Sequence, residues 1–416
     1  MKKEKATFRI TNSFSNQFIC KNEIKKMFIS VLVLFLLIFI INKSDCLKNS
    51  RFIQVRRKTA NSYIINRNAI NTDRNNVENV ENMINKKYKF DNVNNFRETI
   101  GYNSNSNELS NINIPIYRSA AFDNATSNDV KILLDDYKIA TIIDLRNQDE
   151  IINQGMYRSF DGASKFYDKF STAPSPTYPR KMLPDYIRYE IPLLSDLASF
   201  WEAVQLRSIK DEKERLYFDF LWCFRGKELM KILSQRLASG GFPLLYTIML
   251  DISSEKIGQV LLLTLISLEM NKPVVFHCAQ GKDRTGIIAM LIEYIVYVDE
   301  ELQCSNNVQL EDVEQMIIQN YAISELLLPA DKKDILGDGK GIQADDGNFI
   351  SKLKGSPASA MIGTLSYIKE NWGSVLKYLD YTGFNKEKRN RLRRICSKYM
   401  SSPDNNTDTF TMLEKE

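Results

Sequence analysis

The chain has 416 residues, of which 44% are hydrophobic and 26% charged, an ordinary composition for a globular protein. Its formal net charge is +5. Residues 1–26 contribute +5, residues 27–46 contribute nothing and residues 47–75 contribute +6, so residues 76–416 carry −6. We therefore expect no basic face of the kind that binds nucleic acid.

The cysteines and the histidine limit the metal and redox chemistry. The cysteines are scattered and form no C-x-x-C pair, which argues against a disulfide scaffold and against a zinc site of ordinary spacing. The chain has one histidine, so a His-rich metal site is excluded and a Ser-His-Asp triad could use only His277. We expect no metal ion and no organic cofactor. The six cysteines are Cys20, Cys46, Cys223, Cys278, Cys304 and Cys396.

An apolar run, MFISVLVLFLLIFII, occupies Met27–Ile41. It is short for a membrane span, which needs about 20 residues, and lies at the upper end of the lengths of signal-peptide cores. Ser44 and Cys46 follow at plausible cleavage positions. The pattern predicts a signal peptide or a membrane anchor over residues 1–46, with a buried helix as the third interpretation. Either of the first two directs the chain to a membrane system, in the secretory pathway or as an anchored protein.

Residues 47–93 are expected to be an asparagine-rich linker. Asn occurs seventeen times in residues 61–113, and such polar sequence buries too little apolar surface to become ordered. The basic, acid-poor start of this linker also resembles an organelle transit peptide. We expect a disordered N-terminal region, an ordered domain over 94–400 and a disordered tail over 401–416.

The ordered part reads as an α/β fold in chain order. Short apolar runs predict buried parallel strands, and longer amphipathic stretches predict helices. The helix expected at 284–298 is apolar nearly all round, which is typical of a core helix. Strands are expected at 139–146, 188–194 and 273–278. Helices are expected at 127–138, 197–237 (one or two), 254–270, 284–298 and 365–396 (two, broken at Gly383), with an inserted loop at 331–355.

The segment PVVFHCAQGKDRTGIIAML (273–291) combines a strand, a loop and a helix. Backbone N–H groups in such a loop, at a helix N-terminus, form a cradle for phosphate. Gly281 permits the tight turn, and the guanidinium of Arg284 matches two phosphate oxygens. The same positive environment lowers the pKa of Cys278, so we expect a thiolate at the floor of the cradle. Thr285 is placed to donate its hydroxyl to that thiolate.

Other interpretations of this loop fit less well. A Walker A loop needs Gly where Phe276 stands and Ser or Thr where Asp283 stands. A Cys-His dyad is disfavoured because adjacent strand residues face opposite ways, so His277 is a poor base for Cys278. An inert buried thiol remains the plain alternative for Cys278. We expect His277 to support the loop through hydrogen bonds of its ring.

HCAQGKDRTG (277–286) resembles the signature of the cysteine-dependent phosphatases. The segments around it are similar to the bacterial-type tyrosine phosphatase family, whose members also act on phosphoinositides. The family's fold is a mainly parallel central sheet flanked by helices, with an inserted helical lid. Where the family usually has Asp-x-Gly-Gly, this chain has Glu98 and Ile100. The matching segments are NFRETIGY (95–102), IYRSAAF (116–122), IIDLRNQDE (142–150), EQMIIQNYAIS (314–324) and WGSVLKYLDYTGFNKEKRNRLR (372–393).

The resemblance implies roles for individual residues. Cys278 corresponds to the nucleophile, Arg284 to the phosphate-binding arginine and Asp283 to the general acid. Independently of the resemblance, Asp283 could instead only orient Arg284, with Asp196 from a flanking loop as the acid. The remaining loop residues are expected to bind substrate, and Lys282 suits highly anionic substrates such as inositol lipids. The expected substrate-binding residues are Ala279, Gln280, Gly281, Lys282 and Thr285, and the supporting residues are His277, Asp144 and Arg146.

These features predict a phosphatase that acts on phosphotyrosine or phosphoserine proteins or on phosphoinositides. The alternatives are a catalytically weak pseudo-phosphatase that binds phosphate and recruits partners, and a sulfur transferase that works through Cys278. Residues 197–222 hold a cluster of large aromatic side chains within a Lys/Arg-bearing stretch. That stretch either packs on the core or forms a mobile lid that meets membrane lipid. We expect membrane association and no nucleic-acid partner.

Overall fold

The computed structural model describes residues 87–100, 102–103, 108–109, 114–147, 150–151, 186–194, 197–209, 211–298, 310–328 and 355–401. The expected signal peptide or anchor, most of the linker, the inserted loop up to residue 354 and the C-terminal tail lie outside the described residues. None of the helices within these ranges is long and apolar enough to cross a membrane.

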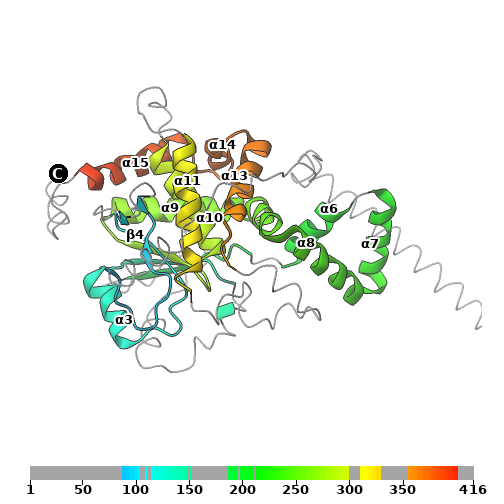
Figure 1. The fold of residues 1–416 in the computed structure, drawn as a ribbon, viewed down its shortest axis with the longest axis horizontal. Coiled ribbons are helices and arrows are strands. Elements are labelled where there is room, and N and C mark those ends of the chain that lie inside the picture. The colour runs from blue at the N-terminus through cyan, green and yellow to red at the C-terminus, as the bar shows by residue number, and fades with distance from the viewer. Residues whose placement is uncertain are drawn as a thin grey trace, which may run out of the picture. The chain divides into compact units, whose positions relative to one another are not determined.

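Helices and strands alternate through the middle of the chain, as the sequence predicts (Figure 1). The strands are β1 (Arg97–Glu98), β2 (Tyr102–Asn103), β3 (Glu108–Leu109), β4 (Ile116–Ser119), β5 (Thr141–Asp144), β6 (Ile187–Glu190) and β7 (Val274–His277). The helices are α3 (Ser127–Lys131), η2 (Ile132–Asp136, a π-helix), α6 (Leu197–Ser208), α7 (Glu212–Phe224), α8 (Gly226–Ile252), α9 (Ser254–Glu269), α10 (Asp283–Tyr297), α11 (Leu310–Ala322), η3 (Ile323–Glu325, a 3-10 helix), α13 (Ala358–Trp372), α14 (Val375–Tyr381) and α15 (Lys386–Ser401).

Five strands form one sheet in the order β1-β4-β7-β5-β6. The pairs β4–β7, β7–β5 and β5–β6 are parallel, and β1 is antiparallel to β4 at the edge. Strands β2 and β3 form a separate antiparallel pair. The mainly parallel central sheet that the sequence predicts is therefore confirmed. Its central strand, β7, is the one that leads into the candidate phosphate loop.

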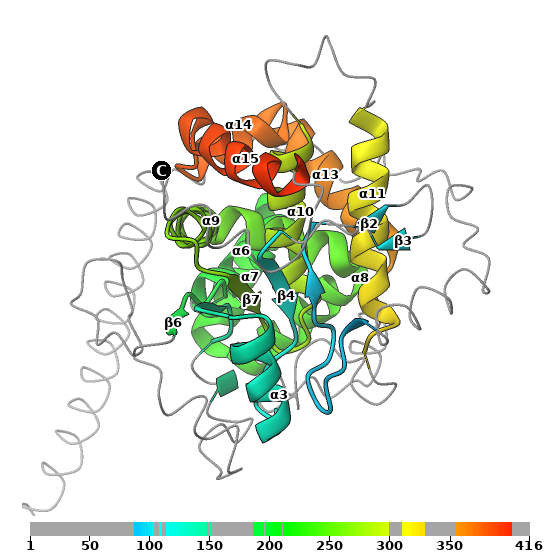
Figure 2. The same ribbon diagram turned by 90° about the vertical axis from the view of Figure 1, so that its left-hand side faces the viewer.

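Both faces of the sheet are covered, so adjacent residues of one strand enter different cores. Ile142 of β5 and Val275 of β7 face a smaller core with α3 and a group of aromatic rings. Ile143 and Phe276, their neighbours, face the larger core built by α8 to α10 and α13 to α15. This alternation explains why the strands read as continuous apolar runs. Figure 2 shows α3 on one side of β4 and β7, with α9, α10 and α15 on the other.

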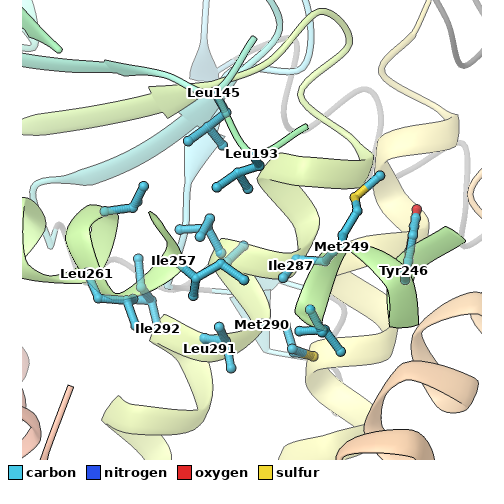
Figure 3. Close-up of a cluster of buried hydrophobic side chains, with 14 of the residues drawn as sticks. Leu145, Leu193, Tyr246, Met249, Ile257, Leu261, Ile287, Met290, Leu291 and Ile292 are labelled. Atoms are coloured by element: carbon cyan, nitrogen blue, oxygen red, sulfur yellow. The ribbon is translucent and has the colours of Figure 1, made fainter. Parts of the chain in front are cut away.

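Helix α10 lies in the larger core, as its unbroken apolar sequence predicts. Every residue from Asp283 to Val296 is buried, including the acidic residue Glu293. Figure 3 shows side chains of α10 packed against those of α8 and α9, among them Ile287, Met290 and Leu291. The sheet and this core hold the start of α10 firmly at the end of β7.

Two segments differ from the expectation. The C-terminal region contains three helices rather than two, because Gly373 adopts a left-handed conformation with φ of 83° and ends α13. Gly383, the break that was predicted, separates α14 from α15. Residues 197–237 belong to three helices, since Arg225 leaves helical geometry between α7 and α8.

The aromatic residues of α6 and α7 divide into two groups. Phe200, Trp201 and Phe218 are buried and join the larger core, which confirms the packing interpretation for them. The exposed apolar side chains of the two helices are Leu206, Leu216, Tyr217, Phe220, Trp222 and Phe224. Figure 1 shows α6 and α7 to one side of the sheet, with α8 leading back to it.

A close approach between α9 and the end of α14 tests the packing of this fold. A Cβ atom on Gly258 would lie 2.0 Å from the carbonyl oxygen of Thr382, so the backbones would have to separate. We expect Gly258→Ala to lower the free energy of unfolding by about 1–3 kcal/mol in a denaturant titration, a typical cost of overpacking. Gly226→Ala is the control, because nothing lies within 4 Å of its added Cβ atom. Equal stability of the two variants would contradict this packing.

Candidate functional site

The candidate phosphate loop runs from Cys278, directly after the central strand, to Arg284 in the first turn of α10. Cys278 is 2% exposed, and Asp283, Arg284 and Thr285 are buried at the start of the helix. The free backbone N–H groups of a helix N-terminus favour a negative charge there. The structure thus places a buried thiol at the positive end of a buried helix.

Three backbone carbonyls of the loop are held by donors that lie outside it. Asn95 donates through Nδ2 to the carbonyl oxygens of Gln280 (2.9 Å) and Gly281 (3.0 Å). Arg118 donates to the Gly281 carbonyl oxygen (3.1 Å), and the N–H of Ala121 donates to that of Ala279 (3.2 Å). Because these carbonyls bond to the surrounding fold, the loop is fixed from its outer side.

Gly281 is the turning point of the loop. Its φ of 66° is in the left-handed region, where a Cβ atom is unfavourable. A Cβ atom there would also lie 2.4 Å from the carbonyl oxygen of Ser119, at the end of β4. Both observations agree with the prediction that the turn requires glycine.

The guanidinium of Arg284 is oriented by a bidentate ion pair. Nη1 and Nη2 donate to Oε2 and Oε1 of Glu150 at 2.5 and 2.6 Å, and Nη1 lies 3.5 Å from the carbonyl oxygen of Leu145. Burial acts to raise the pKa of Glu150, but Arg284 outweighs it, so that pKa lies below its ordinary value. Arg284 has five N–H donors, of which these bonds use both on Nη1 and one on Nη2. The N–H of Nε and the second N–H of Nη2 remain, and they point the same way, so they can bind two oxygens of a ligand.

Asp144 and Arg146, the predicted supporting residues, belong to a buried charge network at the end of β5. Asp144 accepts hydrogen bonds from Arg146 (3.0 Å from Nε) and from Arg188 (2.6 Å). Arg146 also donates to Asp123 (2.5 Å). Although burial opposes ionisation, Arg146 and Arg188 hold the pKa of Asp144 well below its usual range. The network keeps the end of β5 in place beside the loop.

His277 ends β7 and is fully buried against Phe122, with ring centroids 4.8 Å apart. Its Nε2 lies 3.7 Å from Asp144, and among the described residues neither ring nitrogen has a partner with hydrogen-bond geometry. The ring hydrogen bonds expected for it are therefore not seen in this part of the chain. Burial lowers the pKa of His277 to about 3, so the ring is neutral at physiological pH.

Lys282 and Asp283 turn toward α8 rather than toward β5. The ammonium of Lys282 donates to the carbonyl oxygen of Gly355 (2.8 Å) and lies 5.1 Å from the ring centroid of Phe242. Asp283 accepts a hydrogen bond from the hydroxyl of Tyr246. The buried hydroxyl of Thr285 has no partner among the described residues, so it is available for the donation predicted for it.

Asp196, the alternative acid, lies outside the described residues. Within the described ranges, no group of three or more His, Cys, Asp or Glu side chains could hold a metal ion. The thiol, the guanidinium fork and the helix N-terminus together suit an oxyanion, with Asp283 as the nearby carboxyl group. The arrangement can bind a phosphate and present a nucleophile to it.

Several residues of this site were not identified from the sequence. Glu150 stands in the segment IIDLRNQDE, but nothing in the pattern shows that it pairs with Arg284. Asn95 and Tyr246 lie 183 and 32 residues before Cys278, so only the fold brings them to the loop. The positive φ of Asn95, 55°, is a conformation that asparagine tolerates better than most residues and is the one local hint.

The hydrogen bonds of Asn95 provide a test of how the loop is held. In Asn95→Asp the carboxylate replaces two donors by an acceptor that faces two carbonyl oxygens. We expect the free energy of unfolding to fall by about 2 kcal/mol and the thermal stabilisation by orthophosphate to be lost. Asn371→Asp is the control, since this exposed amide also donates to a backbone carbonyl, that of Tyr367. Unchanged stabilisation by orthophosphate in Asn95→Asp would show that the loop does not depend on this contact.

Comparison with known proteins agrees with this geometry. No curated protein matches the sequence. A family model described as tyrosine phosphatase family matches residues 88–397, about three quarters of the chain. The match spans the five-stranded sheet, the loop after β7 and the helices up to α15. The chain therefore belongs to the tyrosine phosphatase family.

Proposed function

We propose that this protein hydrolyses phosphomonoesters through a cysteinyl-phosphate intermediate on Cys278. Membership of the tyrosine phosphatase family implies phosphoric monoester hydrolysis. The observation that carries the specific mechanism is the position of Cys278 between the central strand and the N-terminus of α10, beside an Arg284 that Glu150 orients. A nucleophile, an anion site and a carboxyl group then lie in one loop.

The proposed reaction has two steps. In the first, the Cys278 thiolate attacks phosphorus, the bond from phosphorus to the leaving oxygen breaks, and Asp283 gives that oxygen a proton. In the second, water attacks the phosphocysteine, Asp283 accepts a proton from it, and the thiolate leaves with phosphate released. Arg284 and the backbone N–H groups stabilise the charge on the equatorial oxygens in both steps.

The substrate we propose is a phosphoprotein or a phosphoinositide, as the resemblance of HCAQGKDRTG to the bacterial-type phosphatases suggests. Lys282 would contact a highly anionic substrate only after leaving the carbonyl oxygen of Gly355. The ammonium group of Lys282 is already buried, so it would lose no further water of its own on exchanging this acceptor for a phosphate. A panel of phosphotyrosine and phosphoserine peptides and inositol phospholipids would identify the class.

Replacing the nucleophile tests the mechanism. We expect Cys278→Ser to lower turnover by about 10²-fold or more while orthophosphate still binds, because Arg284 and the helix N-terminus remain. Cys396→Ser is the control, since it is also a buried free cysteine and lies in the core. Residual turnover above a few per cent in Cys278→Ser would exclude the covalent mechanism. A wild-type protein that binds orthophosphate without turnover would instead be the pseudo-phosphatase.

The role of Asp283 is tested by comparing leaving groups. An alkoxide needs a proton to leave, whereas an activated phenol leaves largely unaided. We expect Asp283→Asn to slow hydrolysis of a phosphoserine peptide by about 10²-fold and that of p-nitrophenyl phosphate much less. Equal losses on both substrates would assign Asp283 a structural role, and Asp196→Asn would then be expected to show the selective loss.

We also propose that the exposed face of α7 contacts a lipid bilayer. Six of the ten exposed large hydrophobic side chains of the described residues lie in α6 and α7, and such a concentration marks an interaction surface. Trp222 and Tyr217 are amphipathic side chains of the kind enriched at membrane interfaces. Lys213, Arg215 and Arg225 stand on or beside the same helix. The apolar run at 27–41 independently predicts that the chain meets a membrane.

Vesicle co-sedimentation of a chain lacking residues 1–46 tests this surface. We expect Phe220→Ser/Trp222→Ser to reduce binding to anionic vesicles by about 10-fold or more, from the apolar area lost. Met270→Ser/Tyr381→Ser is the control pair, because these side chains are exposed by 52% and 53%, close to the 52% of Phe220, but lie elsewhere. Equal binding by both pairs would mean that α7 does not touch lipid.

A further inference from the structure

Two buried tyrosines lie behind Asp283 and belong to neither the phosphate loop nor its helix. Tyr246 is on α8 and Tyr321 is on α11, 75 residues apart in the sequence. Both are at most 1% exposed, and Asp283 is 5% exposed. Figure 3 shows Tyr246 on α8 near Met249, at the edge of the apolar cluster.

The hydroxyl groups form a directed chain that ends on one oxygen of Asp283. Tyr246 donates to Oδ1 of Asp283, and the hydroxyl oxygens of Tyr246 and Tyr321 are 2.7 Å apart. A phenol has a single hydrogen, so Tyr321 must be the donor in the second bond. Oδ1 is thereby engaged, while the other oxygen, Oδ2, lies 3.8 Å from the ammonium of Lys282.

Cations and anionic groups both lie near this hydrogen-bond chain, since Arg284 also interacts with Glu150 and both Arg284 and Arg118 interact with Cys278. Lys282 and Arg284 flank Asp283 in the loop, and Arg118 of β4 interacts electrostatically with both tyrosines. Burial and then the charge of Asp283 raise the pKa of Tyr246 and of Tyr321 well above 10, so both remain protonated donors at neutral pH. The direction of the chain is therefore the same across the pH range in which such an enzyme works.

A buried tyrosine usually finds a partner for its hydroxyl, and most such bonds are only structural. Tyr378 is an example in this fold, since it donates to the backbone carbonyl of Leu250 (2.9 Å). Tyr246 differs because its acceptor is a carboxylate inside the phosphate loop. A bond to one oxygen of a carboxyl group restricts both the rotation of the group and the oxygen on which a proton can reside.

We propose that Tyr246, held by Tyr321, is a positioning residue that fixes Oδ1 of Asp283 and so makes Oδ2 the oxygen that delivers the proton to the leaving group. This inference rests on the proposed function, in which Asp283 is the acid. In the protonated state Oδ1 still accepts from Tyr246, so the acidic hydrogen resides on Oδ2. The contribution should be large for alkyl phosphates and small for activated aryl phosphates.

The expected kinetic effect follows from the same bond. In Tyr246→Phe the kcat should fall because the acid is less well oriented. The KM should change little, because Arg284 is held by Glu150 and not by Tyr246.

The experiment compares Tyr246→Phe, Tyr321→Phe and the control Tyr378→Phe in the full chain, each on a phosphoserine peptide and on p-nitrophenyl phosphate. We expect Tyr246→Phe to lower kcat on the peptide by about 10-fold, with KM nearly unchanged, and to change kcat less than about 2-fold on the aryl phosphate. Tyr321→Phe should show the same pattern more weakly, and Tyr378→Phe should not show the selective loss. In an Asp283→Asn background, Tyr246→Phe should have no further effect on the peptide.

Equal losses of Tyr246→Phe on both substrates, a loss expressed in KM rather than in kcat, or a full additional loss in the Asp283→Asn background would each overturn the proposal. If Tyr246→Phe unfolds, the same three measurements on Tyr321→Phe test the proposal. Failure of the proposed function has a different signature, because the wild type would then release no phosphate from either substrate or Cys278→Ser would remain active.

Discussion

The carbonyl groups of the loop between Cys278 and Arg284 need hydrogen-bond donors, because they are buried away from water. An unpaired buried carbonyl lowers the stability of the fold, so each of these carbonyl groups requires a hydrogen-bond donor next to it. Asn95, which lies just before the edge strand β1, and Arg118 of β4 satisfy two of them. Arg97 in turn holds Asn95 and bonds to Asn320 of α11. Residues of the edge strand β1 and of α11 are thus needed to hold the side chains that bond the loop, although they lie far from it in the sequence.

The buried charges near the loop are balanced so that positive charge remains for an anion. Arg97 and Arg118 are fully buried, and Glu293 of α10 is the acidic side chain that interacts with both. Burial raises the pKa of Glu293 to about 8, although Arg118 and Asn320 oppose this. Glu293 is therefore mostly neutral at pH 7, and it accepts a hydrogen bond from Asn320 without cancelling the arginines. The positive potential of the loop then has a source besides Arg284 and the helix dipole.

The parts of this site that the sequence predicts are those formed by neighbouring residues. Cys278, Gly281 and Arg284 are recognisable because strand, loop and helix follow one another within 25 residues. Glu150 and Tyr246 are not, since their contacts with Arg284 and Asp283 depend on how separate elements pack. Gly373 illustrates the same limit for the fold: it ends α13 in a left-handed conformation, but the residues around it also fit one continuous helix.

Two different parts of the molecule hold the loop, and they contact different functional groups of it. Arg284 is held by Glu150, from the β5 side, whereas Lys282 and Asp283 contact Phe242 and Tyr246 of α8.

Helix α8 is interrupted at Gly241, whose φ of 61° and ψ of −156° are not helical, and Pro243 follows. Phe242 and Tyr246 of its second half contact the loop, whereas Arg236 of its first half bonds to Glu214 of α7. Asp283 and Lys282 thus contact α8, whereas Arg284 is held by Glu150. In the mechanism proposed above, proton delivery and anion binding would therefore depend on different elements of the fold.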